Sequence, residues 1–535
     1  SRSKDAGGNG IPMCGLPFHA ADGYIARLVK KGFRVAICEQ VEDPKKAKGL
    51  VRREVVRVVS PGTLTDASYL DAREPAFLMS IATSGSREPV FGAALIDLST
   101  GEFSAAEYHG SAGLESLADE VAVLRPREIV VSNEQEKPTI VDRLVALTRV
   151  EPAVTMADGW SFEPEAARRA LLDQLKTHGL EGFGLEGRTA AIQAAGALVT
   201  YLRDTQKADL AHVRSIGYRT SSDSLIIDPI TLKHLEVVTG SEGGAQGSLL
   251  HEIDRTITSM GGRLLRAWLL RPLCALERIR DRLDAVEELA FRSTERGKFR
   301  DTPKGVPDLE RLIGRVALGT AGPRDLVSLR QSLETVPRIK LILDQCQAPL
   351  MLSLLAEVDE LADVRELIER TLLDEPPAIV REGGFTRDGV DPALDELKAI
   401  SRSGRQVIAE MEDRERSRTN ISSLKVRFNR VFGYYIEISK ANLHLVPSDY
   451  LRKQTIAGGE RFTTPALKEY EEKVLGGDER ILTRELEIFE ALRSSVAAEA
   501  ARIQDTARAL ATLDVLAGLA ETAAIANYTK PHLHE

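Results

Sequence analysis

Two long stretches of helical periodicity enclose a stretch of strand-like alternation near the C-terminal end of the sequence, and this order limits the possible folds. The first stretch begins at Asp391-Pro392, which supplies an N-cap followed by proline at the first helical position. Apolar residues keep helical spacing from Leu394 to Met411, and we expect the helix to end near Asn420. A helix of that length spans about 43 Å.

Residues 424–439 then follow a period of two and contain four aromatic side chains, which predicts β-strands. Thr464-Pro465 caps a new helix, and Gly476-Gly477 is expected to interrupt it. Residues 479–527 return to helical spacing over about 70 Å. We therefore expect a small β domain at the tip of two long helices.

The chain has 535 residues, of which 43% are hydrophobic and 28% charged, as in soluble proteins of several domains. A hydrophilic N-terminal segment and the lack of eighteen consecutive apolar residues predict a cytoplasmic protein without membrane association. Four scattered cysteines predict neither disulfides nor a zinc site. The first residue, Ser1, indicates a processed chain or a fragment.

The net charge of −9 is unevenly distributed. Residues 1–65 hold twelve Lys or Arg against six acidic residues, and residues 424–464 hold seven against three. The rest of the chain therefore carries a net charge of −19. Two basic segments on an acidic protein are typical of a nucleic-acid binder that contacts phosphates at two places, although surface charges also cluster by chance.

The remaining sequence suggests three further regions. A helix is expected at residues 22–31, with strands at 33–38 and 54–59 and a turn at 60–63. Strands and helices alternate from about residue 71 to 212, which predicts an α/β domain. Helical patterns dominate from residue 215 to about 375.

Several blocks resemble the MutS family of bacterial mismatch-recognition proteins. Residues 424–475, including Gly459-Glu-Arg-Phe-Thr-Thr-Pro465, resemble its clamp region, and residues 254–269 resemble the start of its lever core. Residues 11–20 and 36–40, with Ser60-Pro-Gly-Thr63, are similar to the later part of its mismatch-binding domain. The resemblance covers essentially the whole chain.

The resemblance implies a multidomain α/β and all-α fold. Its expected parts are a partial mixed α/β mismatch-binding domain (1–65), an RNase H-like α/β connector (72–213), an all-helical lever core (214–423), an inserted basic β clamp (424–475) and the returning lever helix (476–535). The family's Phe-x-Glu motif and its ATPase domain are not found, and no G-x-x-x-x-G-K-[ST] occurs. We therefore expect a MutS truncated at both ends and without enzymatic activity.

Positions carried over from the family predict contacts with double-stranded DNA, chiefly to phosphates, which position a protein without specifying sequence. These positions are Arg53, Lys48, Met13, Asn429, Arg430, Arg452, Lys453 and Arg461. Pro12 and His19 lie in the same block as Met13, and each single residue has the alternative of an ordinary surface or structural role.

No cofactor is expected in this chain, because ATP and Mg²⁺ would bind the missing ATPase domain. The resemblance implies a homodimer partner and a MutL-like effector that contacts the connector. Two other functions remain open, a helical protein-interaction scaffold and a metal-dependent nuclease centred on Asp97. Two-metal cleavage needs several acidic residues, and we place no convincing second or third one, so a turn-capping Asp97 is favoured. His532 and His534 resemble a metal pair only by composition.

Overall fold

The computed structural model describes residues 15–17, 20–42, 51–85, 88–134, 140–220, 224–429, 433–456 and 458–534, with the backbone alone at 400–409, 428–429, 433, 456 and 469–476. The chain divides into two compact units. The large unit comprises Ser1–Ala321, Ser328–Ala362 and Ser495–Glu535, and the small unit comprises Gly322–Val327 and Asp363–Ser494.

The described N-terminal part of the large unit contains a helix and two strands, as predicted, and the strands pair as a β-hairpin. Helix α1 (Ala21–Lys30) is followed by the antiparallel strands β1 (Val35–Gln40) and β2 (Arg53–Val59). Val29 of the helix and Val59 of β2 pack into a small apolar cluster. The far ends of both strands are exposed on both faces, so only the base of the hairpin is anchored by burial.

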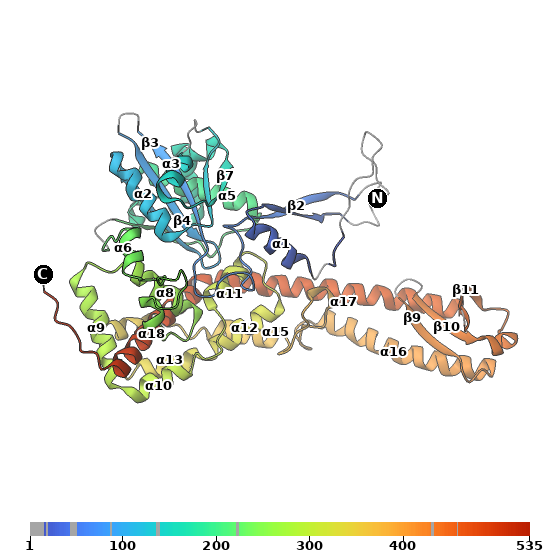
Figure 1. The fold of residues 1–535 in the computed structure, drawn as a ribbon. Helices are drawn as coiled ribbons and strands as arrows, with labels where there is room; N and C mark the ends of the chain where they lie inside the picture. The colour runs from blue at the N-terminus through green and yellow to red at the C-terminus, as the bar shows by residue number, and fades with distance from the viewer. Residues whose placement is uncertain are drawn as a thin grey trace. The chain divides into compact units, whose positions relative to one another are not determined.

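A six-stranded sheet forms the α/β domain of the large unit (Figure 1). Its order is β7 (Ala153–Ala157), β6 (Glu128–Ser132), β3 (Phe77–Ser84), β4 (Val90–Asp97), β5 (Glu102–His109) and β8 (Gly217–Tyr218). Strands β3, β4 and β5 form an antiparallel meander, whereas β6, β7 and β8 each pair in parallel with a neighbour. The α/β domain predicted from the sequence is thereby confirmed.

Helices cover both faces of this sheet because alternate residues of its strands are apolar in both directions. Met79 and Ile81 of β3 pack with α2 (Gly110–Leu124) and α3 (Ile140–Thr148), whereas Leu78 and Ala82 pack with α4 (Pro164–Leu175) and α5 (Thr189–Gln206). The short 3₁₀ helices η2 (Gly159–Phe162) and η3 (Glu181–Phe183) lie between β7 and α5 in the chain.

Helices dominate between β8 and about residue 375, as expected. The helices are α6 (Pro229–His234), α7 (Leu249–Ile253), α8 (Ser259–Leu270), α9 (Leu276–Phe291), α10 (Ser293–Asp301), α11 (Leu309–Ala317), α12 (Pro323–Leu333), α13 (Val336–Leu343), α14 (Pro349–Glu357), α15 (Ala362–Thr371) and the 3₁₀ helix η4 (Val380–Glu382). In the large unit, α8 and α9 pack on α18 (Ala500–Ala526).

Helix α18 is long and apolar enough to cross a membrane by length and composition alone. Its residues Leu510, Leu513 and Leu516 are buried in the large unit. The fully buried carboxylate of Asp514 accepts hydrogen bonds from the Ile257 and Thr258 amides at the start of α8. The helix is therefore packed as the central helix of a helical domain.

In the small unit, α16 (Pro392–Thr419) and α17 (Pro465–Ala498) flank a four-stranded antiparallel sheet (Figure 1). The sheet has the order β11 (Leu451–Ile456), β12 (Gly459–Thr463), β10 (Gly433–Ser439) and β9 (Lys425–Asn429), with the 3₁₀ helix η5 (Lys440–Leu445) after β10. The predicted caps are confirmed: Asp391 accepts a hydrogen bond from the Leu394 amide at 2.8 Å, and Thr464 accepts one from the Leu467 amide at 3.2 Å. Arg484 pairs with Asp391 at 2.7 Å, which joins α17 to the start of α16.

The returning helical segment differs from the prediction. Helix α17 runs without interruption through Gly476-Gly477, and the break falls instead at Glu499, before α18 begins. A glycine inside a helix costs only about 1 kcal/mol relative to alanine, which the long helix can absorb. At Glu499 the backbone amide bonds to Val496 three residues back, which tightens the turn and separates the two helices.

Candidate nucleic-acid interface

The β1–β2 hairpin presents Arg53 at the end farthest from its anchored base. Arg53 is exposed and pairs with Gln40 across the hairpin. Among the described residues, the structure gives the Arg53 side chain no hydrogen-bond or ion-pair partner. Its neighbour Arg52 instead forms an ion pair with Glu54. In the described part of the hairpin, Arg53 is therefore a cation that is available for an external anion.

Two other cations of the N-terminal basic segment serve the protein's own structure. Arg57 donates to Gln206 at 2.9 Å and to Thr65 at 3.1 Å, and burial lowers its pKa. The Arg34 guanidinium lies 5.9 Å from the centre of the Tyr201 ring. The charge count of the sequence therefore overstates the basic surface of this segment, because a count cannot separate exposed cations from paired ones.

The sheet of the small unit has one apolar face and one polar face, as the period of two predicts. Ile436, Ile438 and Phe462 are buried with Tyr450 and Leu467 in an apolar cluster. Alternate residues on the same strands must then point to the opposite face. The alternation in the sequence therefore sets which cations share a surface.

We define the polar face as Lys425, Arg427, Tyr435, Glu437 and Arg461. Directly paired residues of neighbouring strands lie on the same face. Glu437 pairs with Lys425 on one side and with Arg461 on the other, and Tyr435 pairs with Arg427. Three cations thus surround one carboxylate and one aromatic ring, a combination suited to a polyanion. Lys425 and Arg427, both exposed, were missed as contact candidates, although their alternation with Val426 could have indicated them.

Arg461 is held within this polar face. Its guanidinium donates to Gln454 Oε1 at 2.8 Å, lies 3.5 Å from Glu437 and stacks 4.4 Å from the centre of the Tyr435 ring. Only 19% of its side chain is exposed. Arg461 therefore contributes charge to the face from a fixed position rather than as a free surface side chain.

Arg452 lies on the other face of the sheet from Arg461. It pairs with Phe462, which belongs to the apolar cluster, and its side chain is 63% exposed beside Glu460 at 3.3 Å. Lys453 occupies the irregularity between the pairs of Arg452 and Gln454, and its Nζ donates to the Tyr434 carbonyl at 3.3 Å. The structure therefore brings the three predicted clamp cations into one sheet but not onto one face.

The other predicted DNA-contact residues are described in part or not at all. Asn429 is the last residue of β9 and pairs with Gly433 through the backbone, and its side chain lies outside the described part of the chain. Lys48, Met13 and Arg430 also lie outside the described residues, as do Pro12 and His19. Their roles stay predictions.

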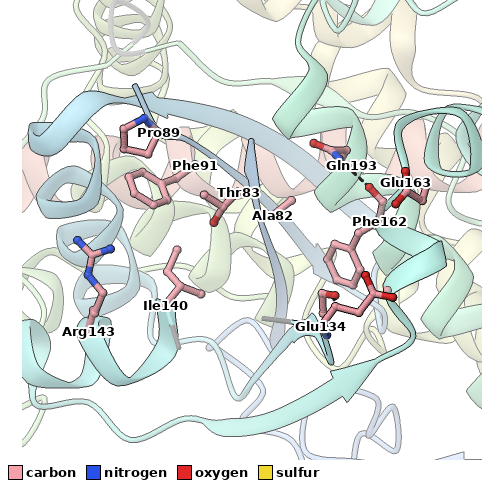
Figure 2. A pocket seen from close by; sticks show the side chains of 12 residues that line it. Ala82, Thr83, Pro89, Phe91, Glu134, Ile140, Arg143, Phe162, Glu163 and Gln193 are labelled. Atoms are coloured by element: carbon pink, nitrogen blue, oxygen red, sulfur yellow. Dashed lines mark hydrogen bonds between the residues drawn. The ribbon is translucent and has the colours of Figure 1, made fainter. Parts of the chain in front are cut away.

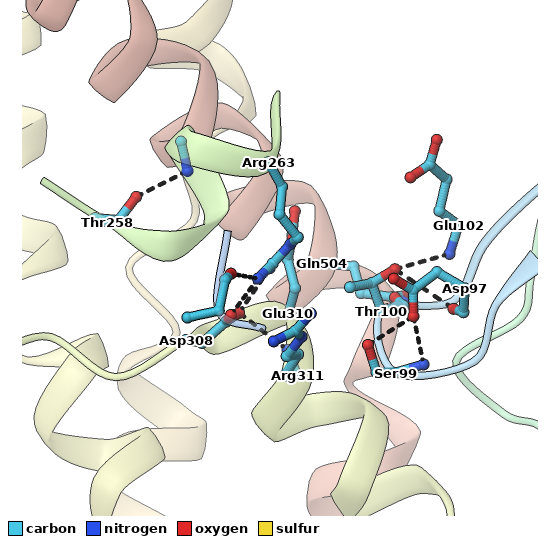
Figure 3. A network of polar contacts seen from close by, with 12 residues as sticks. Asp97, Ser99, Thr100, Glu102, Thr258, Arg263, Asp308, Glu310, Arg311 and Gln504 are labelled. Carbon is cyan, nitrogen blue, oxygen red and sulfur yellow. Dashed lines mark hydrogen bonds and ion pairs between the residues drawn. The ribbon is translucent and has the colours of Figure 1, made fainter. Parts of the chain in front are cut away.

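Asp97 caps the turn between β4 and β5, as favoured from the sequence. Its buried carboxylate accepts hydrogen bonds from the Ala76 amide at 2.9 Å, the Ser99 amide at 2.9 Å and the Ser99 hydroxyl at 2.6 Å (Figure 3). Nearby, Arg263 of α8 forms ion pairs with Asp308 and Glu310. The Asp97 carboxylate is therefore used in turn formation, and Arg263 is paired with Asp308 and Glu310 at the start of α11.

Glu102 faces a cavity of about 810 Å³ between the α/β domain and the helical part of the large unit. Its side chain is exposed on the cavity side, and desolvation by the surrounding walls raises its pKa to about 7, with the carboxylates of Asp97 and Glu310 adding to the effect. In Figure 3 its side chain points away from the Arg263–Asp308 pair. Among the described residues, no group of three or more His, Cys, Asp or Glu side chains could hold a metal ion.

A second cavity, of about 390 Å³, lies at the carboxyl ends of β3 and β6 (Figure 2). Phe91 and Phe162 form part of its wall, and Glu134 and Glu163 lie near one end. Gln193 donates to the Phe162 carbonyl at 2.8 Å, and its own side-chain carbonyl oxygen is buried with no hydrogen-bond partner among the residues that the structure describes. None of the residues that line this cavity belongs to the β1–β2 hairpin or to the polar face of the small unit.

Comparison with known protein families places three matches along the chain in order. The profile of MutS domain I matches residues 1–68, MutS domain II matches 76–214 and MutS domain III matches 230–520. The last of these alone covers more than half of the 535 residues.

Curated relatives agree. The chain is 47% identical over 523 residues to the DNA mismatch repair protein MutS of Symbiobacterium thermophilum, covering 97% of this chain and 59% of that protein. It is 48% identical to the protein of the same name from Solibacter usitatus, covering 99% and 60%, and 44% identical to that of Myxococcus xanthus, covering 100% and 59%. The chain thus spans about 60% of the length of these relatives. With three family domains matched in order and such identities along its length, the chain belongs to the MutS family.

Proposed function

We propose that this chain binds double-stranded DNA as the DNA-holding part of a mismatch repair protein. The observation that carries the proposal is the polar face, on which Lys425, Arg427 and Arg461 lie together on a sheet flanked by two long helices. Relatives named DNA mismatch repair protein MutS support it. Phosphate contacts from such a face give affinity without sequence preference.

The proposed contacts are those of the hairpin and of the sheet in the small unit. They comprise Arg53, Lys48, Met13, Asn429, Arg430, Arg452, Lys453 and Arg461, together with Lys425 and Arg427. We assign the parts of the chain as a partial mismatch-binding domain (1–65), an RNase H-like connector (72–213), a helical lever core (214–423 and 476–535) and a β clamp (424–475). The strand order β7-β6-β3-β4-β5 supports the connector assignment.

Further partners follow from the family. We propose that the whole protein acts in the cytoplasm as a homodimer, that a MutL-like effector contacts the connector, and that ATP and Mg²⁺ bind an ATPase domain in the part of the relatives that this chain does not match. The chain itself acts without a cofactor in this proposal. ATP binding elsewhere in the whole protein would then act on the clamp through the rigid helices.

A salt titration of duplex binding tests the proposal. We expect the logarithm of the binding constant for a fluorescent duplex to fall linearly with the logarithm of the salt concentration, because each neutralised phosphate contributes about −0.9 to that slope. The double variant Lys425→Glu/Arg427→Glu should lose most of the affinity and flatten the slope. Fluorescence anisotropy gives both quantities.

The matched control changes the same charge elsewhere. Lys298 of α10 and Arg338 of α13 are exposed and lie in neither basic segment. Lys298→Glu/Arg338→Glu should leave the slope unchanged, apart from a small general loss of attraction. Affinity independent of ionic strength, or an equal loss in both double variants, would refute phosphate binding by the polar face.

A further inference from the structure

Glu128, the first residue of β6, has a fully buried carboxylate whose two oxygens accept four hydrogen bonds. Oε1 accepts from the hydroxyls of Thr155 at 2.6 Å and Tyr201 at 2.8 Å. Oε2 accepts from the Gly62 amide at 2.9 Å and from the Ser60 hydroxyl. A buried charge is costly unless it is fully hydrogen-bonded, so this carboxylate depends on all four donors staying in place.

The four donors come from two parts of the large unit. Thr155 on β7 and Tyr201 on α5 belong to the α/β domain, whereas Ser60 and Gly62 form the turn that directly follows β2. The turn is in close contact with the sheet, because a Cβ atom at Gly62 would lie 2.6 Å from Leu78 Cδ1. Glu128 therefore ties the base of the hairpin to the sheet.

A second set of contacts holds the same end of the hairpin. Gln206 of α5 accepts from Arg57 Nε at 2.9 Å and donates to the Val58 carbonyl at 3.2 Å. Farther along β2, Val55 and Val56 are exposed. Among the described residues, the attachment of the hairpin is thus concentrated at its base, which makes the base a pivot.

We propose that Glu128 is a positioning residue that sets the direction in which the β1–β2 hairpin, and with it Arg53, leaves the α/β domain. Arg53 lies six residues from Val59, or about 20 Å at about 3.3 Å per residue, so a tilt of about 10° at the base moves it by about 3.5 Å. That displacement exceeds the tolerance of a charge-assisted hydrogen bond to a phosphate. The direction stands on the geometry alone, whereas its consequence for DNA rests on the proposed function.

Distance measurement between two spin labels tests the direction. One label is placed on the exposed Cys38 of β1 and the other on Leu147→Cys, an exposed position of α3, after Cys14 and Cys274 are replaced by Ser. We expect one narrow distance distribution for the parent protein and a broadened or shifted one for Glu128→Ala. If the alanine variant does not fold, Ser60→Ala removes one donor and should broaden the distribution less.

Two variants separate positioning from general destabilisation. Glu128→Gln should restore the narrow distribution, because its carbonyl can face the Gly62 amide and its NH₂ can donate to hydroxyls that rotate. Asp514→Asn weakens another fully buried carboxylate, in α18, and should leave the distances unchanged. A narrow, unshifted distribution in Glu128→Ala or, where that fails to fold, in Ser60→Ala overturns the proposal.

Duplex binding supplies a readout that a purely structural residue would not change. In Glu128→Ala the salt slope should become less negative by about 0.9 for each phosphate that the hairpin no longer neutralises. Glu128→Gln and Asp514→Asn should keep the parent slope. A changed distance with an unchanged slope would refute the link from Glu128 through Arg53 to DNA. If the parent protein binds no duplex, the proposed function fails, and the distances still decide the positioning role.

Discussion

Arg461 lies with its guanidinium carbon 4.4 Å from the centre of the Tyr435 ring on the neighbouring strand of the same sheet. The ring face is electron-rich, so it attracts the cation. The Arg461 guanidinium also forms an ion pair with Glu437 and donates a hydrogen bond to Gln454. A cation fixed in this way presents its charge at a defined place on the polar face. It also becomes part of what stabilises the sheet.

We expect Arg461→Ala to destabilise the small unit. The substitution removes the cation–π contact, the hydrogen bond to Gln454 and the ion pair with Glu437, and it leaves Glu437 without one of its cationic neighbours. We expect a loss of about 1–2 kcal/mol, since most of this side chain is buried. Urea unfolding followed by circular dichroism measures it, and an unchanged midpoint would contradict the network's role.

Arg452→Ala should have the opposite profile. Its side chain is largely exposed, and its pair with Glu460 is a surface ion pair, which contributes little to stability. We expect an unchanged unfolding midpoint. If Arg452 contacts one phosphate, its loss makes the salt slope of duplex binding less negative by about 0.9. An unchanged slope would remove Arg452 from the proposed contacts while leaving the polar face in place.

Glu102 predicts a specific pH dependence of stability. Its pKa is about 7 in the folded protein against an ordinary value of 4.5, so the folded state holds the proton over that range and the unfolded state does not. The contribution of Glu102 to the free energy of unfolding therefore falls as pH rises from 4.5 to about 7, and this loss persists at higher pH. The side chain opens to a cavity, so solvent screens part of the effect.

The variant Glu102→Gln removes the titrating group and checks this sign. Its melting temperature should match that of the parent protein near pH 4 and exceed it at pH 8. Glu115→Gln, at an exposed position of α2, serves as the control and should show no such divergence. A variant that is equally or less stable at pH 8 would show that desolvation and the charges of Asp97 and Glu310 do not raise the pKa of Glu102 in the folded protein.

Asp97→Ala should destabilise the α/β domain and should not change whether the protein cleaves DNA. The amides of Ala76 and Ser99 lose a buried acceptor, which costs about 1–3 kcal/mol. The exposed Asp173→Ala on α4 should be neutral in the same unfolding assay. We expect no nicking of a supercoiled plasmid in Mg²⁺ by either the parent protein or Asp97→Ala, and nicking that disappears in the variant would contradict the capping role.

Much of the element order could be predicted from local signals. The caps Asp391 and Thr464 have side-chain acceptors and precede proline, so the starts of α16 and α17 follow from bonds made within three residues. Period-two alternation identified β9 and β10, because side chains along a strand point alternately to its two faces. Gly476-Gly477 misled, because helix propensity is a weak influence that a long helix overrides.

Contacts between distant segments could not be predicted in this way. The order β7-β6-β3-β4-β5-β8 brings together strands that lie far apart in the chain, and the convergence of Ser60, Thr155 and Tyr201 on Glu128 depends on it. The register of β12 likewise decides that Arg461 and Arg452 face opposite sides. The irregularity at Lys453 interrupts a simple alternation on β11, so sequence position alone does not give the face.

The amino-acid sequence by itself determined the family, the long helices with a strand-rich insertion between them, and the two basic segments, because these depend on local motifs, periodicity and composition. Only the tertiary structure decided which cations are exposed and which are paired, that Arg461 and Arg452 lie on opposite faces of their sheet, and that a buried carboxylate anchors the hairpin. Pairing and burial depend on neighbours that come from remote parts of the chain, and local sequence patterns do not show which remote residues lie close together in space.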